Sequence, residues 1–586
     1  MASPTHHATS NPAWTPPSGK PPWSSRLMRA IWRDLPARRH EAGWESGLVA
    51  PAADGSPLIT DHYFPRAEGD FPTLVVRSPY GRGLPWSPMY GMLFAEQGFH
   101  VVLQSCRGTG GSGGRFDLWR NEAADGQATV SWLREQPWFN GTLGTVGPSY
   151  LGYVQWALAL DPPPELKAMV VQVGLHDPYA LFHTDGALHL ENALLVGVGM
   201  TYQHRGTASF VRATLRLRRR LRGIITAQPL RGAHMSALGR EVPWLDDVMT
   251  HPDADDPYWD GASKGRAAER LSVPTGLITG WHDALADQTF EQYGRLRRAG
   301  CETALLVGPW THTSALQRGW PEVFAESLAW LRAHLCADSS GLRPTAVRVH
   351  VGGEDAWRDL DDWPLSPAAA PWFPAPGGYL TQQPATDSAP LASFRYDPAA
   401  PTPSLGGPLL SPAAGPRDNS ALEAREDVLT FTGPPLTEPV DILGPVSARL
   451  SIATDTGHAD VFTRLCDVDA QGRSTNICDG LARLRTVGQA PSQVTVPMSA
   501  TAHRFAAGHR MRWQISGGAH PRYARNPGTG ESPLDAEELT PVRITLHADS
   551  ALMLPRSVKA AQPFGVQQPD AWTDAWTAAT ARPRTP

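Results

Sequence analysis

The stretch Gly144-Thr-Val-Gly-Pro-Ser-Tyr-Leu-Gly152 places a serine between a short apolar strand and a helix. We predict the strand over 144–147 and the helix over 150–160, which puts Ser149 on the turn between them. A hydroxyl nucleophile on such a turn needs small neighbours, because the backbone there is strained and closely packed. The spacing is G-x-S-x-x-G, one residue longer than the G-x-S-x-G nucleophile pattern. The helix N-terminus behind Ser149 also offers backbone N–H groups to a developing oxyanion.

Strand-like and helical patterns alternate on both sides of this segment. We predict buried strands at 73–77, 100–104, 274–279 and 303–307, and helices at 89–97, 122–136 and 323–335. Strands in alternation with helices indicate βαβ units and a mostly parallel sheet.

The pattern of apolar residues along the sequence changes twice. Between 176 and 268, apolar residues recur at helical spacing, which predicts a helical insertion. After about 342, short β-rich segments alternate with Pro/Gly-rich connections, which is typical of an all-β sandwich or jelly roll. The Pro-rich stretch 364–416 fits an ordered meander on that domain or a partly disordered linker. We therefore divide the 586 residues into an N-terminal extension (1–44), an α/β domain (45–175 and 269–341), a helical insertion (176–268), an all-β domain (342–560) and a tail (561–586).

Charge and composition narrow the classes of partner. The 52 Lys and Arg residues nearly balance 57 Asp and Glu residues, for a net charge of -5. This balance gives no electrostatic reason to expect nucleic acid or an anionic membrane as a partner. The arginine-rich run 212–222 could suggest nucleic acid, but Leu215, Leu217 and Leu221 interleave its charges as in an amphipathic helix.

The cysteines and the N-terminus bear on the cellular setting. Five scattered cysteines without a C-x-x-C pair indicate neither a zinc site nor a disulfide framework, so we expect a reducing cytoplasm. The N-terminus lacks the pattern of a secretory signal, and the apolar stretches fall short of the roughly 20 residues that span a bilayer.

A nucleophilic serine needs a base, and the base needs an acid to orient it. The predicted strand 274–279 runs into Gly280-Trp-His-Asp283, and the strand 303–307 runs into Gly308-Pro-Trp-Thr-His312. Both motifs lie at the carboxyl ends of strands, where open α/β sheets place their chemistry. We predict Asp283 as the acid and His312 as the base. His282 is an alternative base that would break the order Ser, acid, His, and Asp287 is an alternative acid one helical turn further on.

Seven motifs in this order resemble the cocaine-esterase (CocE/NonD) family, relatives of X-prolyl dipeptidyl peptidases and α-amino-acid ester hydrolases. The motifs are Arg77-Ser-Pro-Tyr80, Arg107-Gly-Thr-Gly-Gly-Ser-Gly-Gly114, Gly147-Pro-Ser-Tyr-Leu-Gly152, Gly280-Trp-His-Asp283, Gly308-Pro-Trp-Thr-His312, Asp460-Val-Phe-Thr-Arg-Leu-Cys-Asp-Val-Asp469 and Pro521-Arg-Tyr-Ala-Arg-Asn526. The resemblance implies an α/β-hydrolase domain with a helical cap insertion and a C-terminal β jelly-roll domain. It also implies a serine hydrolase that cleaves an ester or amide.

The same resemblance assigns two further roles. The residue at the position of Tyr80 donates its phenol O–H to the oxyanion, and the backbone N–H of Tyr150 is the second donor. In the amino-ester branch of the family, acidic residues two and three positions after the catalytic Asp hold the substrate's ammonium. Here these positions are Leu285 and Ala286, so an amine-recognising enzyme is disfavoured.

The remaining expectations concern the pocket, the cofactors and the rival functions. Four tryptophans lie near the motifs and either wall an acyl pocket or pack in the core: Trp138, Trp156, Trp281 and Trp310. We expect a small-molecule ester or amide substrate and neither a metal nor an organic cofactor; the sequence says nothing of the oligomeric state. The rivals are an acyltransferase or cyclase with the same triad, an X-prolyl dipeptidyl aminopeptidase, and a catalytically silent binding protein.

Overall fold

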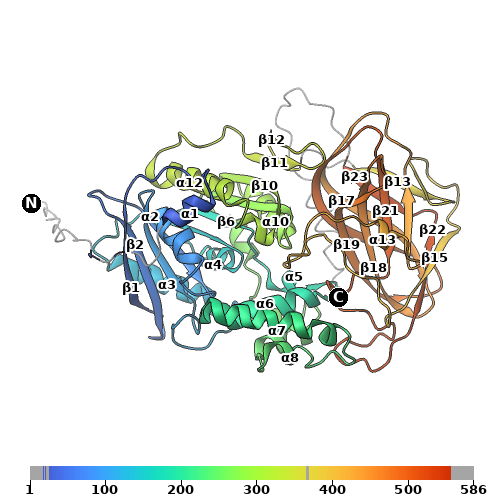
Figure 1. Cartoon of the computed structure of the whole chain (residues 1–586), viewed down its shortest axis with the longest axis horizontal. Helices are drawn as coiled ribbons and strands as arrows, with labels where there is room; N and C mark the ends of the chain where they lie inside the picture. The colour runs from blue at the N-terminus through green and yellow to red at the C-terminus, as the bar shows by residue number, and fades with distance from the viewer. Residues whose placement is uncertain (1–16, 19, 21–24, 365–368, 556–586) are drawn as a thin grey trace, which may run out of the picture.

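The computed structural model describes residues 17–18, 20, 25–364 and 369–555 (Figure 1). Of the expected N-terminal extension, 1–44, it describes the short helix α1 (Ser25–Ile31) and the chain that follows. The expected tail, 561–586, lies outside the described residues. An α/β domain and an all-β domain form the two halves of the molecule, and a group of helices lies below and between them in this view (Figure 1).

The α/β domain is built on one sheet, whose described strands follow the order β1-β2-β4-β3-β5-β6-β9-β10-β11-β12. The strands are β1 (Ala42–Pro51), β2 (Pro57–Pro65), β3 (Thr73–Ser78), β4 (His100–Ser105), β5 (Leu143–Pro148), β6 (Leu166–Gln172), β9 (Thr275–His282), β10 (Thr303–Thr311), β11 (Val347–Val351) and β12 (Ala356–Leu360). The strands from β4 to β11 run parallel, and β1, β2 and β12 are antiparallel additions at the edges. Every residue of β3, β4 and β5 is buried, which explains their continuous apolar runs.

Helices cover both faces of this sheet. They are η1 (Ser87–Met92), α2 (Leu93–Ala95), α3 (Glu122–Arg134), α4 (Tyr150–Leu158), α10 (Ala286–Arg298), α11 (His312–Ala315) and α12 (Trp320–Cys336). Successive side chains of β3 enter opposite clusters: Val75 packs with Trp156 and Phe290, whereas Val76 packs with Phe94 and Phe324. This alternation is the period of a strand that is covered on both sides.

The sheet extends beyond the expected domain boundary at 342. β11 pairs in parallel with β10, and β12 follows as the edge strand. By this pairing, 347–351 joins the α/β sheet and not the jelly roll. Its alternation of valines with Arg348 and His350 fits a strand of either sheet, so the sequence alone does not identify its partner.

The expected helical insertion forms the cap. Its elements are α5 (Pro178–Phe182), β7 (His183–Thr184), β8 (Ala187–Leu188), α6 (Leu190–Tyr202), η2 (Gln203–Arg205), α7 (Thr207–Ile225), α8 (Met235–Leu238), α9 (Pro243–Thr250), η3 (Pro257–Trp259) and η4 (Gly265–Glu269). The arginine-rich run lies in α7, where Leu217 is buried and all six arginines from Arg212 to Arg222 are exposed. Leu215, which we expected on the apolar face, is 44% exposed. Apart from this residue, α7 has the expected amphipathic pattern.

The all-β domain carries the remaining described strands, and their inner faces enclose a core around Phe505 and Trp513. The strands are β13 (Ala369–Ala375), β14 (Tyr379–Thr381), β15 (Pro390–Tyr396), β16 (Val428–Thr432), β17 (Val440–Thr454), β18 (Gly457–Val468), β19 (Ser474–Val487), β20 (Ser492–Phe505), β21 (Arg510–Ser516), β22 (Val542–His547) and β23 (Ala551–Pro555), with the short helix α13 (Ser420–Glu423). In the Pro-rich stretch 364–416, residues 365–368 lie outside the description, and the rest carries the three strands β13 to β15.

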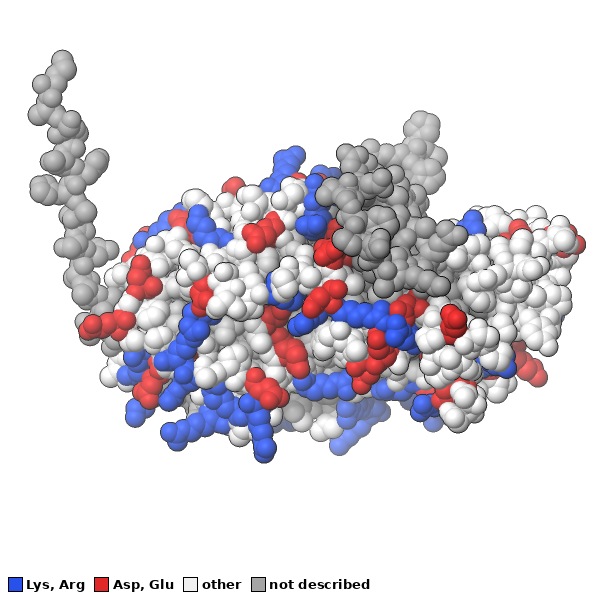
Figure 2. Space-filling view, turned by 90° about the horizontal axis from the view of Figure 1, so that it is seen from above, with Lys and Arg blue, Asp and Glu red and all other residues white. Residues whose placement is uncertain are grey.

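The surface and the helices add two observations about the setting of the protein. Figure 2 shows basic and acidic side chains interspersed with uncharged residues over one face of the molecule, in keeping with the small net charge. In the described part of the chain, no helix combines the length and the apolar character needed to cross a membrane.

Candidate active site

Ser149 lies on a sharp turn between β5 and α4. Its backbone has φ 56° and ψ -124°, a strained conformation for a residue with a side chain. Two close approaches explain the neighbouring glycines. A Cβ on Gly147 would lie 2.5 Å from the Cβ of Leu151, and one on Gly152 would lie 2.8 Å from Cγ1 of Val171. The backbone N–H of Ser149 donates to the carbonyl of Gln172 at 3.0 Å, which ties the turn to β6. The predicted strand–turn–helix is therefore present.

Asp283 and His312 meet at the ends of the neighbouring strands β9 and β10. His312 Nδ1 lies 2.8 Å from Oδ1 of Asp283. The carboxylate also accepts hydrogen bonds from the backbone N–H of Leu285 at 3.1 Å and from Oγ1 of Thr279 at 2.9 Å. The Asp283 side chain is fully buried, and that of His312 is 12% exposed. A buried, ionised carboxylate at Nδ1 favours the imidazole tautomer whose Nε2 accepts a proton.

The backbone around His312 is also fixed. Thr311 is the N-cap of α11: its Oγ1 accepts from the backbone N–H of Ser314 at 3.2 Å, and Oγ of Ser314 accepts from the N–H of Thr311 at 2.8 Å. This reciprocal cap holds the first residue of the helix, which is His312.

The two alternatives that the sequence left open have other contacts. Oδ2 of Asp287 accepts from Oγ of Ser499 in the jelly roll at 3.1 Å, and burial raises the pKa of Asp287 to about 6. His282 lies toward charged groups of the jelly roll, and burial lowers its pKa to about 4. Among these candidates, the structure brings Asp283 and His312 together.

Tyr80 reaches the serine from the loop after β3. Its Oη lies 3.3 Å from Oγ of Ser149, and its ring stacks on Trp86 with the centroids 5.2 Å apart. Burial raises the pKa of Tyr80 to about 12, while the hydroxyl of Ser149 and the backbone N–H of Tyr150 lower it against that effect. The phenol therefore stays protonated at neutral pH and can donate a hydrogen bond.

The hydrogen bonds of the site form two separate pairs. Ser149 is joined to Tyr80, and His312 is joined to Asp283; within the described chain no hydrogen bond links Ser149 to His312. Such contacts are often long in an empty site and shorten when substrate binds. The described residues contain no group of three His, Cys, Asp or Glu side chains arranged as metal ligands.

An apolar cluster with residues from all three domains includes Tyr150. Leu285 joins it from the α/β domain and Leu188 from the cap. Leu534 and the partly buried Leu410 come from the jelly roll, and sequence reasoning missed both. They lie on loops whose position depends on how the domains meet, and no motif marked them.

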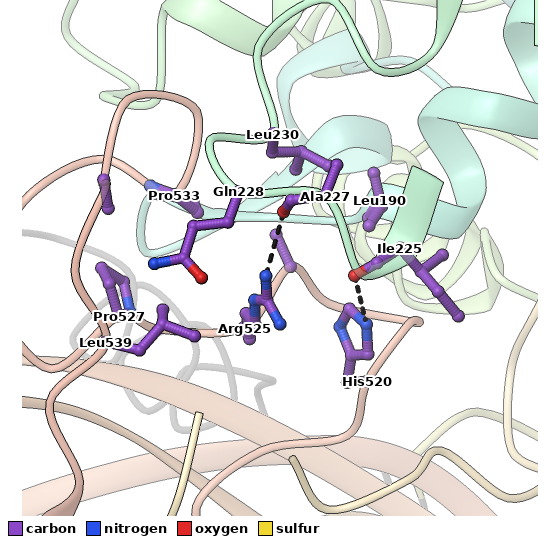
Figure 3. Close-up of a pocket in the computed structure, with 12 residues that line it drawn as sticks. Leu190, Ile225, Ala227, Gln228, Leu230, His520, Arg525, Pro527, Pro533 and Leu539 are labelled. Atoms are coloured by element: carbon purple, nitrogen blue, oxygen red, sulfur yellow. Dashed lines mark hydrogen bonds between the residues drawn. The ribbon is translucent and has the colours of Figure 1, made fainter. Parts of the chain in front are cut away.

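The jelly roll holds the cap through the loop that contains Leu534. Arg525 donates to the carbonyl of Thr226 at 3.2 Å, just after the end of α7. Figure 3 shows two further bonds: Arg525 donates to the carbonyl of Ala227 at 2.9 Å, and His520 Nε2 lies 3.1 Å from the carbonyl oxygen of Ile225. The end of α7 is thus bound by jelly-roll side chains. Cationic and N–H donor groups suit this position, because the last carbonyls of a helix lack partners of their own.

The tryptophans predicted near the pocket pack elsewhere. Trp281 donates from Nε1 to the carbonyl of His350 at 2.6 Å and belongs, with Trp138 and Trp156, to a cluster between the sheet and its helices. Trp310 packs in the cluster on the opposite face. None of the four is in the cluster around Tyr150. These contacts support packing roles and give the pocket interpretation no support.

A serine strained between strand and helix, with an Asp–His pair at later strand ends, defines an α/β-hydrolase site. Comparison with known proteins agrees. The X-Pro dipeptidyl-peptidase (S15) family matches residues 54–314, and the X-Pro dipeptidyl-peptidase C-terminal non-catalytic domain matches 342–553. A cocaine esterase of Rhodococcus sp. (strain MB1 Bresler) is 33% identical over 537 residues, which cover 83% of this chain and 92% of the relative.

Solved structures share the fold. An α-amino-acid ester hydrolase has a TM-score of 0.75 at 21% identity and covers 89% of this chain and 98% of its own. An aminopeptidase from the marine sediment archaeon Thaumarchaeota archaeon has a TM-score of 0.74 at 21% identity and covers 88% and 96%. The chain belongs to the cocaine-esterase (CocE/NonD) family of α/β-hydrolase enzymes, and it is a serine hydrolase that acts on esters. The family and fold predicted from the motifs are confirmed.

Proposed function

We propose that the chain hydrolyses a carboxylic ester through an acyl-enzyme on Ser149, with His312 as the base and Asp283 as the acid that orients it. The observation that carries this assignment is the 2.8 Å contact of His312 Nδ1 with Asp283, at the same edge of the sheet as the Ser149 turn. A second observation supports it: the hydroxyl of Tyr80 lies 3.3 Å from Oγ of Ser149.

The reaction proceeds in two transfers of the acyl group. His312 Nε2 takes the proton of Ser149 as Oγ attacks the carbonyl carbon, and it returns that proton to the departing alcohol when the ester C–O bond breaks. A water molecule then repeats the attack on the acyl-enzyme, with His312 again as the base. Asp283 stays ionised throughout and stabilises the imidazolium.

The oxyanion that forms in each attack receives two hydrogen bonds. Tyr80 Oη is one donor, and the backbone N–H of Tyr150 at the start of α4 is the other. Each donor is worth about 3 kcal/mol of barrier in sites of this type.

The preferred acyl group is uncharged. Leu285 is buried in the apolar cluster around Tyr150, and Ala286 follows it at the start of α10. A substrate ammonium beside these residues would lose its hydration without gaining a partner, which is costly. We therefore favour a neutral small-molecule ester over an amino-acyl ester or an X-prolyl peptide.

A fluorophosphonate probe tests the nucleophile. We expect one covalent adduct on Ser149 in the native protein and none in Ser149→Ala, checked by mass spectrometry of the intact protein and its peptides. An undiminished adduct on Ser149→Ala would contradict the assignment. Product analysis of p-nitrophenyl butyrate turnover, with and without an added alcohol, separates hydrolysis from acyl transfer: we expect butyrate as the main product in both.

A panel of esters tests the substrate class. We expect kcat/KM for p-nitrophenyl butyrate to exceed that for the corresponding amino-acyl ester by at least about tenfold, because each 1.4 kcal/mol of lost binding is a factor of ten. A preference for the amino-acyl ester would contradict the neutral-acyl proposal and leave the Ser149 assignment intact.

We also propose that the protein works in the cytoplasm. Its five cysteines are free thiols, and Cys106, Cys301, Cys466 and Cys478 are buried in that form. Thiol alkylation of the denatured protein, taken directly from cells, tests this: five alkylated cysteines are expected, and a disulfide-linked pair would contradict it.

A further inference from the structure

The side chain of Tyr150 is held at both of its hydrogen-bonding positions. Its phenol donates to Oε1 of Glu122 at 3.0 Å and accepts from the backbone N–H of Trp119 at 3.0 Å. The residue is 3% exposed and is the first of α4, directly after Ser149. The backbone N–H of Tyr150 therefore lies next to the nucleophile, while the side chain of the same residue is fixed by Glu122 and Trp119.

Glu122 is in turn paired with a buried arginine. Oε2 of Glu122 lies 3.0 Å from a terminal nitrogen of Arg77, and the two side chains are 4% and 3% exposed. Arg77 also donates to Oε1 of Gln104 at 2.9 Å and to the backbone carbonyl of Glu122 at 2.8 Å. Burial lowers the pKa of Arg77, but the neighbouring acidic groups, Glu122 first among them, raise it by more. The pKa of Arg77 therefore lies above its ordinary value.

Arg77 connects this pair to the other side of the site. It lies in β3, whose end leads into Tyr80, and the N–H of Tyr80 donates to Oγ of Ser78 at 3.1 Å. The ion pair therefore ties β3, which leads into Tyr80, to Glu122 at the start of α3. Glu122 in turn accepts a hydrogen bond from the phenol of Tyr150, the first residue of α4. Trp119, the other residue that hydrogen-bonds the phenol of Tyr150, has φ 57°, a strained conformation for a bulky side chain.

We propose that the buried Arg77–Glu122 pair is a positioning device that fixes the distance between the two oxyanion donors, Tyr80 Oη and the Tyr150 N–H. This proposal rests on the oxyanion hole assigned above. Small displacements of such donors weaken the stabilisation of the transition state, where their hydrogen bonds are strongest. Arg77 and Glu122 touch neither substrate nor Ser149 in this scheme and act through the two tyrosines.

Tyr150→Phe is the direct test, because it removes the phenol and keeps the backbone N–H. We expect kcat for p-nitrophenyl butyrate to fall about tenfold while KM changes less than about twofold, the pattern of an interaction lost mainly in the transition state. The Ki of phenylboronic acid, whose tetrahedral adduct on Ser149 occupies the oxyanion hole, is expected to rise by about the same factor. A lower melting temperature with unchanged kcat and Ki would overturn the proposal.

Tyr153→Phe is the matched control. Tyr153 lies one turn further along α4, is fully buried, and donates to the carbonyl of Ala262 at 2.7 Å. Its loss removes a buried hydroxyl from the same helix without touching Glu122. We expect a lower melting temperature with kcat and Ki within about twofold of the native values. A fall in kcat equal to that of Tyr150→Phe would mean that general packing of α4, and not the ion pair, sets the rate.

Glu122→Gln tests the pair itself and serves if Tyr150→Phe does not fold. The amide keeps an oxygen for Tyr150 but removes the charge opposite Arg77, so kcat is expected to fall and Ki to rise together. In the double variant with Tyr150→Phe, we expect no more than the larger single effect, because both changes disturb one unit. If the fold-changes of the two single variants multiply in the double variant, Glu122 and Tyr150 do not act as one unit, and the proposal is contradicted.

Tyr80→Phe separates this proposal from the one on which it rests. If that variant leaves kcat and boronate affinity unchanged, the oxyanion hole is wrongly assigned. If Tyr80→Phe lowers both while Tyr150→Phe and Glu122→Gln lower neither, only the positioning role is wrong.

Discussion

Tyr80 and Ser149 are 69 residues apart in the sequence, yet their hydroxyl oxygens lie 3.3 Å from each other. The reason is the pairing of β3 with β5, two parallel neighbours in the sheet. Tyr80 follows the first strand and Ser149 the second, so both side chains emerge at the same edge. The strand order thus places the hydroxyl of Tyr80 beside that of Ser149, although the two residues are far apart in the sequence.

Tyr80→Phe is expected to lower kcat/KM for a neutral ester about 10²-fold, the effect of losing one oxyanion donor worth about 3 kcal/mol. Because the ring still stacks on Trp86, the melting temperature should change little. Steady-state kinetics and thermal unfolding check the two statements. An unchanged kcat/KM would exclude Tyr80 as a donor.

Asp283→Asn is expected to lower kcat about 10⁴-fold, since an amide at this position favours the wrong imidazole tautomer of His312. Asp287→Asn is the matched change: this carboxyl bonds Ser499 and not His312, so kcat should stay within about threefold of the native value. Steady-state assays of both variants decide between the acids, and the reverse ranking would make Asp287 the catalytic acid.

Trp281→Ala is expected to reduce the free energy of unfolding by about 3–5 kcal/mol, as for other buried tryptophans. It removes the contacts with Phe290 and Trp363 and the hydrogen bond to His350. KM for a series of acyl esters should not change. If KM changed while denaturant unfolding stayed native-like, the side chain would line the pocket after all.

His183 makes stability depend on pH. Burial lowers its pKa from 6.5 to about 4, so the unfolded chain binds the proton more readily in this range. The resulting stability is fully present above pH 6.5 and is lost as the pH falls toward 4, by at most about 3 kcal/mol. We expect the free energy of unfolding in urea to fall less between pH 7 and pH 4.5 for His183→Gln than for the native protein. An equal fall in the variant and in the native protein would contradict the role of His183.

The parts of the fold that were predictable are those encoded within one segment. The strand–turn–helix around Ser149 has its own apolar strand, its own glycines and its own helix, and the structure reproduces it. Asp283 and His312 were identified as site residues because each follows a strand end, and a parallel sheet gathers such ends at one edge.

The parts that were not predictable depend on partners far along the chain. The sequence places 347–351 in the jelly roll, because nothing in Val347-Arg-Val-His-Val351 indicates that β10 is its neighbour. Leu410 and Leu534 join the cluster that contains Tyr150 only through the docking of the jelly roll. Trp281 is close to Asp283 in sequence, but it lies within β9, whereas Asp283 follows the strand, and the ring of Trp281 packs in the core.

The contacts of Arg525 and His520 at the end of α7 have a consequence for motion of the cap. A cap that hinged away from the jelly roll would have to break these hydrogen bonds in every catalytic cycle. We therefore expect the end of α7 to keep its position against the jelly roll in the free enzyme and in the acyl-enzyme.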